Sequence, residues 1–209
     1  MTMRTQTKSR KSSPTSGLFL AQDPGSVNHG LAVIDPVSLT ILAHGLNPHT
    51  LTMLMPGVGT QVASYVGLLR ALKAKGCEYA IAERFQTRGI KGLSIELVSA
   101  MLGITLLEFP GKVRLVIASQ WKNAYGRSGL DLDKLYVDMR PITPHQIDAS
   151  LMGLWMACKL RKQPLLGEAK LKHLLLEADQ PSREQLRASM KAKVRPKKKK
   201  RKSSKNKGA

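Results

Sequence analysis

Residues 18–46 read LFLAQDPGSVNHGLAVIDPVSLTILAHGL. Three short apolar runs lie in this stretch, at residues 18–22, 30–35 and 39–46, and each gap between them contains a proline or a glycine. Short buried strands that are joined by tight turns are typical of an antiparallel meander. The stretch therefore predicts three consecutive strands at the start of a folded domain.

Helices and strands alternate after this meander. Apolar residues recur at helical spacing over residues 60–75 and 93–109, and the apolar runs at 78–83 and 113–117 predict two more strands. A strand at 105–109 is the competing interpretation of the end of the second helix. Residues 47–59 and 121–132 read as connections, and residues 132–139 read as a short helix. The order predicts an α/β fold, with a mixed five-stranded sheet flanked by helices.

The last long helix has the clearest start in the sequence. Thr143 is an N-cap residue, Pro144 takes the first helical position and Gln146 follows three residues after the cap. Its predicted buried stripe consists of Ile147, Leu151, Leu154, Trp155 and Cys158. A further helix is expected through residues 171–177.

Positive charge is concentrated at the two ends of the chain. The formal net charge is +20 over 209 residues, and neither residues 1–16 nor residues 191–209 contain an acid. We expect a basic disordered arm (1–16), a folded domain (17–163), a helical extension (164–190) and a lysine-rich disordered tail (191–209). Basic ends favour a polyanionic partner such as nucleic acid, because binding releases counterions from phosphates. A tail that only promotes solubility is the alternative.

The cysteines and the hydropathy pattern bear on the compartment. Cys77 and Cys158 lie among apolar residues and outside any Cys-x-x-Cys spacing, so they read as buried free thiols rather than zinc ligands. No apolar run approaches the length of a membrane span. We expect a cytoplasmic protein of a bacterial or phage-infected cell, and the basic ends leave nuclear or organellar targeting open.

Four side chains in three segments are candidates for chemistry. Asp23 and Glu83 each end an apolar run, while His145 and Asp148 stand three residues apart at the start of the last helix. If the first and fourth strands are parallel neighbours, the two strand-end acids meet at one edge of the sheet. Carboxylates in one place favour hard cations, Mg²⁺ best and Mn²⁺ as an alternative. Two such ions activate a water and stabilise a leaving phosphate oxygen. His145 would be a ligand or a general base.

Each of these residues also has an ordinary structural explanation. Asp23 before Pro24 and Gly25 is a common turn residue, and Glu83 is a common solvated charge at a strand end. His145 near a helix start is commonly a surface or capping residue, and Asp148 is an acid favoured by the helix dipole. It is their combination within one βα framework that favours a site.

The sequence resembles the RuvC-type crossover-junction endodeoxyribonucleases, and more closely the RuvC-like resolvases of phages, within the ribonuclease H-like superfamily. The similar segments, within residues 18–160, are Asp23-Pro24-Gly25-Ser26 with Asn28 and Gly30, Ala82-Glu83-Arg84, Gln120-Trp121-Lys122, and His145-Gln146-Ile147-Asp148-Ala149. The resemblance implies a ribonuclease H-like fold, metal-binding acids at Asp23, Glu83 and Asp148, and His145 as the fourth ligand. It also implies two magnesium ions and paired nicks in a four-way (Holliday) DNA junction, made by a homodimer, with no small-molecule substrate and no membrane.

Candidate DNA contacts follow from this resemblance and from the positions of basic residues. They are Ser26, Asn28, Arg84, Phe85, Arg88, Lys91, Lys122, Arg127 and Lys134. Phe85 is the candidate for a wedge between stacked bases, with ordinary packing as the alternative. The segment 123–142 is shorter than is usual in the family, so Lys122, Arg127 and Lys134 have no assured counterparts in it.

Other functions remain open from the sequence. A non-catalytic nucleic-acid-binding protein with this fold, or a related nuclease that acts on RNA or an RNA–DNA hybrid, would share most of these features. A phosphotransferase of the actin or sugar-kinase type shares the sheet, but it normally needs a second domain with another phosphate loop, for which this chain is too short.

Overall fold

The computed structural model describes residues 17–25, 28–48, 58–84 and 93–178. Its strands form one mixed sheet in the order β3-β2-β1-β4-β5. The strands are β1 (Leu18–Asp23), β2 (Asn28–Asp35), β3 (Thr40–Pro48), β4 (Cys77–Glu83) and β5 (Val113–Val116). β1, β2 and β3 pair antiparallel, whereas β4 runs parallel to both β1 and β5. The predicted meander and the mixed five-stranded sheet are confirmed.

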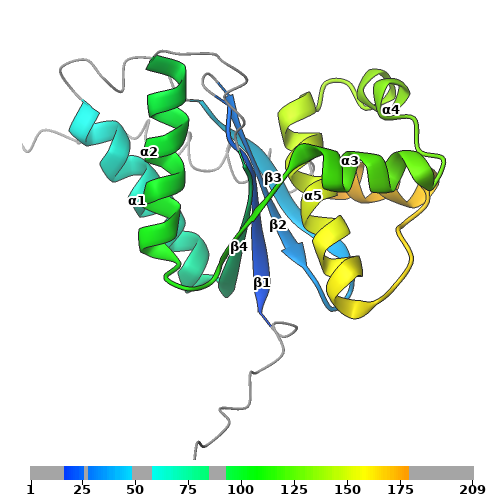
Figure 1. Cartoon of the computed structure of the whole chain (residues 1–209), viewed down its shortest axis with the longest axis horizontal. Coiled ribbons are helices and arrows are strands. Elements are labelled where there is room, and N and C mark those ends of the chain that lie inside the picture. The colour runs from blue at the N-terminus through cyan, green and yellow to red at the C-terminus, as the bar shows by residue number, and fades with distance from the viewer. Residues whose placement is uncertain (1–16, 26–27, 49–57, 85–92, 179–209) are drawn as a thin grey trace, which may run out of the picture.

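Helices cover both faces of this sheet (Figure 1). α1 (Val58–Ala74) and α2 (Leu93–Glu108) lie on one face, where Tyr65, Leu69 and Met101 pack on Leu20 of β1. α5 (Pro144–Arg161) lies on the other face and packs mainly on β1, β2 and β3. α3 (Ala118–Arg127), α4 (Leu132–Asp138) and a last helix over residues 168–178 complete that layer.

The alternation of side chains along β1 decides which layer receives Asp23. Phe19 and Ala21 are buried in the α5 core, whereas Leu20 between them is buried in the α1–α2 core. Because side chains alternate along a strand, Asp23 at the end of β1 belongs to the series that faces α5. The strand thus directs this carboxylate to the helix layer that carries His145 and Asp148.

One expectation from the sequence is wrong, whereas the helix expected over residues 93–109 is confirmed as α2 and its competing interpretation falls. Residues 121–132 were expected to form a connection, but α3 covers the first part of this segment. Trp121 and Tyr125 stand four residues apart and are both fully buried, which places them on one face of a helix. A strand at 105–109 is also excluded, because α2 continues to Glu108 and Thr105 lies within it.

The start of α5 has the expected cap. The Thr143 hydroxyl accepts a hydrogen bond from the Gln146 backbone N–H, and the Gln146 side chain accepts one in return from the Thr143 backbone N–H. The five residues of the predicted stripe are buried. Gln146 thereby satisfies a backbone donor that the helix itself cannot pair.

The helix expected at 171–177 is present and spans residues 168–178, and both cysteines are free and buried. No described helix is long and apolar enough to cross a membrane. The arm at 1–16, the tail at 191–209 and most of the expected loop at 47–59 lie outside the described residues.

α5 approaches the sheet closely at Gly153. A Cβ atom at this position would lie 2.6 Å from Cγ1 of Ile34 on β2 and 2.9 Å from Cβ of Ala21 on β1. Ala21 is fixed in the strand, so the contact cannot relax through a side-chain rotation. A glycine here lets the helix backbone lie directly on the two central strands.

We predict that Gly153→Ala lowers the free energy of unfolding by about 1–3 kcal/mol, because overpacking outweighs the better helix propensity of alanine. Urea denaturation followed by circular dichroism measures this change. Gly67→Ala in α1 is the matched control, since nothing lies within 4 Å of its Cβ position. The control should be neutral or stabilising by up to about 1 kcal/mol. Equal effects of the two substitutions would contradict the close approach.

Candidate active site

Two acids end neighbouring parallel strands at one edge of the sheet. Gln22 of β1 pairs with Ala82 of β4, so Asp23 and Glu83 are the next residues on adjacent strands. The condition set from the sequence, that these strands be parallel neighbours, is confirmed. Both side chains therefore lie at the carboxyl ends of their strands, where polar groups gather without being buried unpaired.

The first turn of α5 is placed against this edge by a glycine on β2. Gly30 pairs with Asp23 across the β1–β2 ladder. A Cβ atom on Gly30 would lie 2.0 Å from the backbone oxygen of His145 and 2.4 Å from its carbonyl carbon. Only a residue without a side chain fits this approach of helix to strand. The contact brings His145 directly beside the strand-end acid.

His145 and Asp23 form the shortest link between α5 and the strands. Nδ1 of His145 lies 2.6 Å from Oδ2 of Asp23. The hydrogen bond to Asp23 raises the pKa of His145, with further contributions from the charges of Asp23 and Asp148, while burial opposes the shift. His145 is therefore more readily protonated than an isolated imidazole.

Asp148, one helical turn further along α5, is held by two donors from the adjoining helices. Nζ of Lys122 on α3 lies 2.8 Å from Oδ2 of Asp148, and the hydroxyl of Tyr136 on α4 donates to Oδ1 at 2.5 Å. Burial raises the pKa of Asp148, while the hydrogen bonds from Lys122 and Tyr136 oppose this. Burial and the Asp148 charge raise the pKa of Tyr136, so its hydroxyl remains a proton donor.

Glu83 accepts a hydrogen bond from α3 and interacts with the charges of the other acids. Nε1 of Trp121 lies 3.1 Å from Oε2 of Glu83. Burial raises the pKa of Glu83 first, followed by the charge of Asp23 and, more weakly, that of Asp148. Repulsion of this kind indicates that the three carboxylates share one electrostatic environment.

Lys122 supplies the positive charge of this environment. Burial opposes its charged form, but Asp148, Glu83 and Asp23 together raise its pKa. Hard divalent cations prefer carboxylate oxygens and a site of net negative charge, so the three acids fit such a cation in donor type and charge. Within the described residues, however, no three His, Cys, Asp or Glu side chains form a ready-made ligand cluster.

Of the other predicted site residues, two lie in or beside the site, three are exposed and four fall outside the described residues. Lys122 lies inside the site through its bond to Asp148, and Asn28 begins β2 beside the Asp23 turn. Arg84 is exposed directly after Glu83, and Arg127 and Lys134 are exposed on α3 and α4. Ser26, Phe85, Arg88 and Lys91 lie outside the described residues.

Two residues that position the acids were not predicted as site residues. Trp121 was noted only as part of a similar segment, and Tyr136 was not singled out. The four-residue spacing of Trp121 and Tyr125 was the available signal, because it indicates a helix whose buried face meets the site. No comparable signal exists for Tyr136, which lies in a helix of seven residues.

A buried histidine links the last helix to the start of α5. Nε2 of His44 on β3 lies 2.9 Å from the carbonyl oxygen of Leu175, and Nδ1 lies 3.1 Å from Nε2 of Gln146. Since a carbonyl only accepts, Nε2 of His44 carries the proton and Nδ1 accepts from the Gln146 amide. This orients the Gln146 oxygen toward Thr143, so the helix cap beside His145 depends on contacts from residues 168–178.

Comparison with known proteins gives a structural likeness without a sequence match. No protein-family model matches the chain, and no curated protein matches it. Thermus thermophilus RuvC in complex with a Holliday junction substrate is similar, with a TM-score of 0.54, 18% identity and coverage of 71% of this chain and 99% of that one. A second Thermus thermophilus RuvC structure gives a TM-score of 0.51, 15% identity and coverage of 71% and 98%. The fold is therefore ribonuclease H-like, as in RuvC.

We predict that Asp23→Asn lowers the pKa of His145 in the metal-free protein, because the negative charge is lost and a neutral amide oxygen accepts a weaker hydrogen bond from the imidazolium. The wild-type pair stabilises the fold most below the ordinary histidine pKa of 6.5, and this stabilisation is lost as pH rises through the raised value. An NMR titration of the His145 ring protons measures the shift, with His173 as an internal reference. An unchanged His145 titration would contradict the pair.

Crowding of the three acids lowers the stability of the fold at neutral pH. Glu83→Gln should raise the melting temperature at pH 7 by about 2–4 °C, corresponding to about 1 kcal/mol, because it removes a buried repulsive charge and keeps an acceptor for Trp121. The fold raises the Glu83 pKa above its ordinary value of 4.5. Ionisation of this carboxyl group therefore lowers the free energy of unfolding as the pH rises from 4.5 through the raised pKa. The gain should vanish near pH 4. Glu177→Gln, at an exposed acid, should change little at either pH.

Proposed function

We propose that this protein is a metal-dependent, structure-selective DNA endonuclease that nicks four-way junctions or other branched DNA by phosphodiester hydrolysis, acting as a homodimer. The RuvC-like fold supports this reading, as does the strong positive charge of the chain. Neutralising phosphates with many basic residues gives salt-dependent binding to nucleic acid.

One observation carries the proposal. Asp23 and Glu83 stand at the ends of adjacent parallel strands, and the first turns of α5 bring His145 and Asp148 to the same place. Burial first, and then the charge of Asp23, raise the pKa values of Glu83 and Asp148, and perturbed acids that lie together in this way support a functional site.

Each side chain has a chemical role in this proposal. Asp23, Glu83 and Asp148 would hold two Mg²⁺ ions, or Mn²⁺, which when bound would activate a water and stabilise the leaving oxygen. His145 would complete the ligand set or take a proton from the attacking water. Lys122 would bind a phosphate oxygen of the DNA, because its ammonium group lies beside the carboxylates that would hold the ions and so beside the phosphate that the ions would bind. Trp121 and Tyr136 would hold Glu83 and Asp148 in place.

A second candidate function is a non-catalytic nucleic-acid-binding protein. The observation that favours it is that Lys122 and Tyr136 engage both oxygens of Asp148, while the described residues contain no preformed ligand cluster. In such a protein the acids and Lys122 would form an internal ion pair, and DNA would bind through the basic residues alone.

A panel of labelled substrates separates these functions. Four-way junction, flap, fork, duplex and RNA–DNA hybrid are incubated with the full chain in Mg²⁺, in Mn²⁺ and in EDTA. We predict paired nicks in the junction with either cation and none in EDTA. Asp23→Asn should reduce cleavage at least 100-fold and leave junction binding within about threefold, since removing one charge from a metal site affects chemistry more than phosphate contacts.

The controls make this assay decisive. Glu177→Gln, an exposed acid of the last helix, should cleave as the wild type does. Millimolar Mg²⁺ should raise the melting temperature of the wild type more than that of Asp23→Asn, which tests metal binding without activity. Binding without nicking under every condition would favour the second candidate, and nicking of the hybrid alone would identify a ribonuclease.

A further inference from the structure

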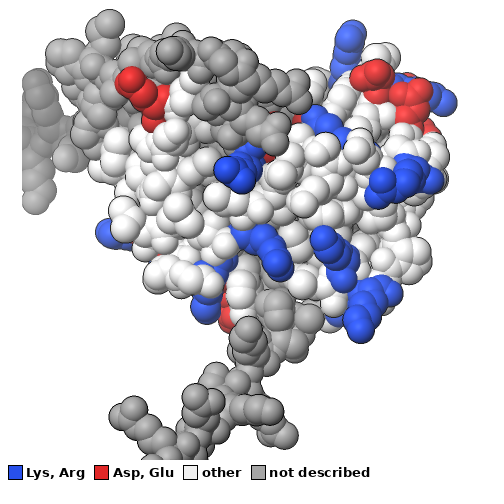
Figure 2. Space-filling model, in the orientation of Figure 1, with Lys and Arg blue, Asp and Glu red and all other residues white. Residues whose placement is uncertain are grey.

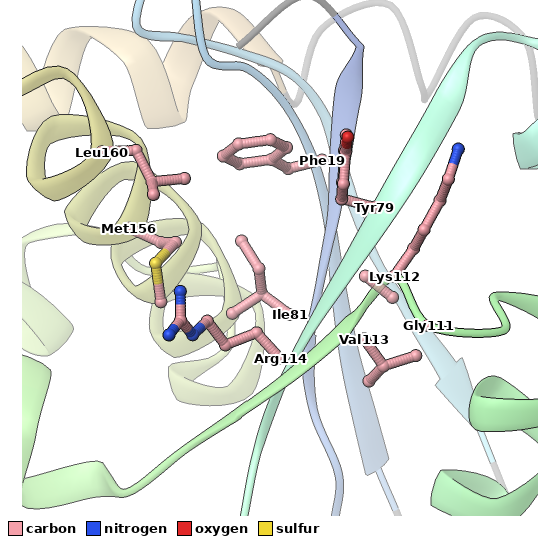
Figure 3. A pocket seen from close by; sticks show the side chains of 10 residues that line it. Phe19, Tyr79, Ile81, Gly111, Lys112, Val113, Arg114, Met156 and Leu160 are labelled. Atoms are coloured by element: carbon pink, nitrogen blue, oxygen red, sulfur yellow. The ribbon is translucent and has the colours of Figure 1, made fainter. Parts of the chain in front are cut away.

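A groove with an apolar floor opens on the α5 face of the sheet, at the end opposite to the candidate active site. Phe19, Tyr79 and Ile81 form its floor, and Met156 and Leu160 of α5 form one wall (Figure 3). Its volume is about 350 Å³. Phe19 and Tyr79 precede the strand-end acids by four residues, which is about 13 Å along the strands, and Ile81 at the inner end of the floor precedes Glu83 by two residues.

The groove exists because α5 covers only part of the sheet. This helix packs mainly on β1, β2 and β3, so the first residues of β4 and β5 on the same face stay partly exposed at Tyr79 and Arg114, while Ile81 and Val116 further along are buried. The ring centroids of Phe19 and Tyr79 lie 6.0 Å apart in an edge-to-face contact; Phe19 itself is buried, so the partly exposed Tyr79 ring is the accessible aromatic part of the floor. An apolar space of this size accommodates one large side chain.

The rim of the groove is basic. Arg114 is exposed on β5 and extends toward Met156, while Nζ of Lys112 lies 5.4 Å from the centre of the Tyr79 ring (Figure 3). No acid is among the described residues that line the groove; Glu78 and Glu108 line a neighbouring pocket that shares Lys112 with it, so Arg114 is the basic residue of the rim that belongs to the groove alone. On the face in Figure 2, basic side chains are scattered over the middle and lower surface, whereas acids gather over α4.

The outer edge of the sheet adjoins this groove. β5 is the last strand of the sheet and pairs only with β4 among the described strands. An unpaired strand edge offers backbone donors and acceptors to an extended peptide, and alternate side chains of such a peptide would enter the groove.

We propose that this groove and the β5 edge bind an acidic segment of a partner protein in extended form, with one large apolar side chain in the groove and flanking carboxylates on Lys112 and Arg114. Charge complementarity favours this occupant over the basic ends of the chain itself, since residues 1–16 and 191–209 contain no acid. The mostly apolar lining favours a peptide over nucleic acid, because a sugar–phosphate backbone has no apolar side chain to place in the groove. The proposal does not depend on nuclease activity.

The probe is a fluorescein-labelled peptide, EDEFDVE, measured by fluorescence anisotropy with the full chain at about 0.15 M salt, where weak surface attraction is screened. Two control peptides replace either the phenylalanine by alanine or all acids by lysine. We expect saturable binding of the probe and at least tenfold weaker binding of each control peptide. Equal binding of the alanine peptide would overturn the proposal, because the groove would then contribute nothing.

Matched variants locate the binding site. Arg114→Glu should lower the affinity for the probe peptide at least tenfold. Lys170→Glu makes the same charge change at an exposed position of the last helix and should leave this affinity within twofold of the wild-type value. Leu160→Trp, which fills the groove instead of reversing a charge, should weaken it to a similar degree, and circular dichroism verifies that each variant is folded. Equal losses in Arg114→Glu and Lys170→Glu would show unspecific attraction to a basic protein.

Two further outcomes would also overturn the proposal. If Arg114→Glu weakens the binding of a DNA junction as much as that of the peptide, the groove belongs to a nucleic-acid surface. If light scattering shows a dimer that Arg114→Glu dissociates, the occupant is a second copy of the chain. We expect instead that junction binding and oligomeric state are unchanged in Arg114→Glu.

Discussion

The close approach of α5 to β2 at Gly30 is the constraint on which the rest of the candidate site depends. The backbone carbonyl of His145 lies where any side chain on Gly30 would stand, and Gly30 is itself paired with Asp23. One backbone contact therefore sets the distance between the helix and the strand-end acid. The cap at Thr143 and the close packing at Gly153 keep the axis of the same helix on the central strands. Strand register, helix start and side-chain geometry are consequences of one packing arrangement.

The acids held together in this way oppose the stability of the fold. Burial and mutual repulsion raise the pKa values of Glu83 and Asp148, and Lys122 brings a permanent positive charge among them. Groups arranged at a cost in stability are characteristic of sites that bind or react. Trp121 and Tyr136 reduce this cost by donating hydrogen bonds, and they also restrict the directions in which the carboxylates can point. The same contacts stabilise the site and shape it.

Most of the sheet could be predicted from the sequence, because apolar runs and turn residues are local signals. The parallel pairing of β1 and β4 is only a condition in the sequence argument, and the structure supplies it, because strand neighbours are set by the packing of the whole sheet. Helix α3 was not predicted because its polar residues and Gly126 dominate the local composition. Its two buried aromatic residues pack in the core with α5, and the sequence alone does not show this contact. The contact of Tyr136 with Asp148 could not be predicted, since it depends on how a seven-residue helix packs. Whether the four candidate ligands bind metal remains a prediction.

The bridge through His44 has a consequence for where the folding unit ends. Leu171, Leu174, Leu175 and Ala178 are buried in the same core as Trp121 and Ile147, and the Leu175 carbonyl accepts a hydrogen bond from Nε2 of His44. A polypeptide cut after residue 163 would retain every candidate ligand. It would nevertheless expose the part of the hydrophobic core that residues 171–178 cover. Its His44 would have lost an acceptor, its Gln146 amide would be free to rotate, and the first turn of α5 would begin to fray. The geometry of the candidate site at one edge of the sheet thus depends on residues that follow β5 by more than fifty positions.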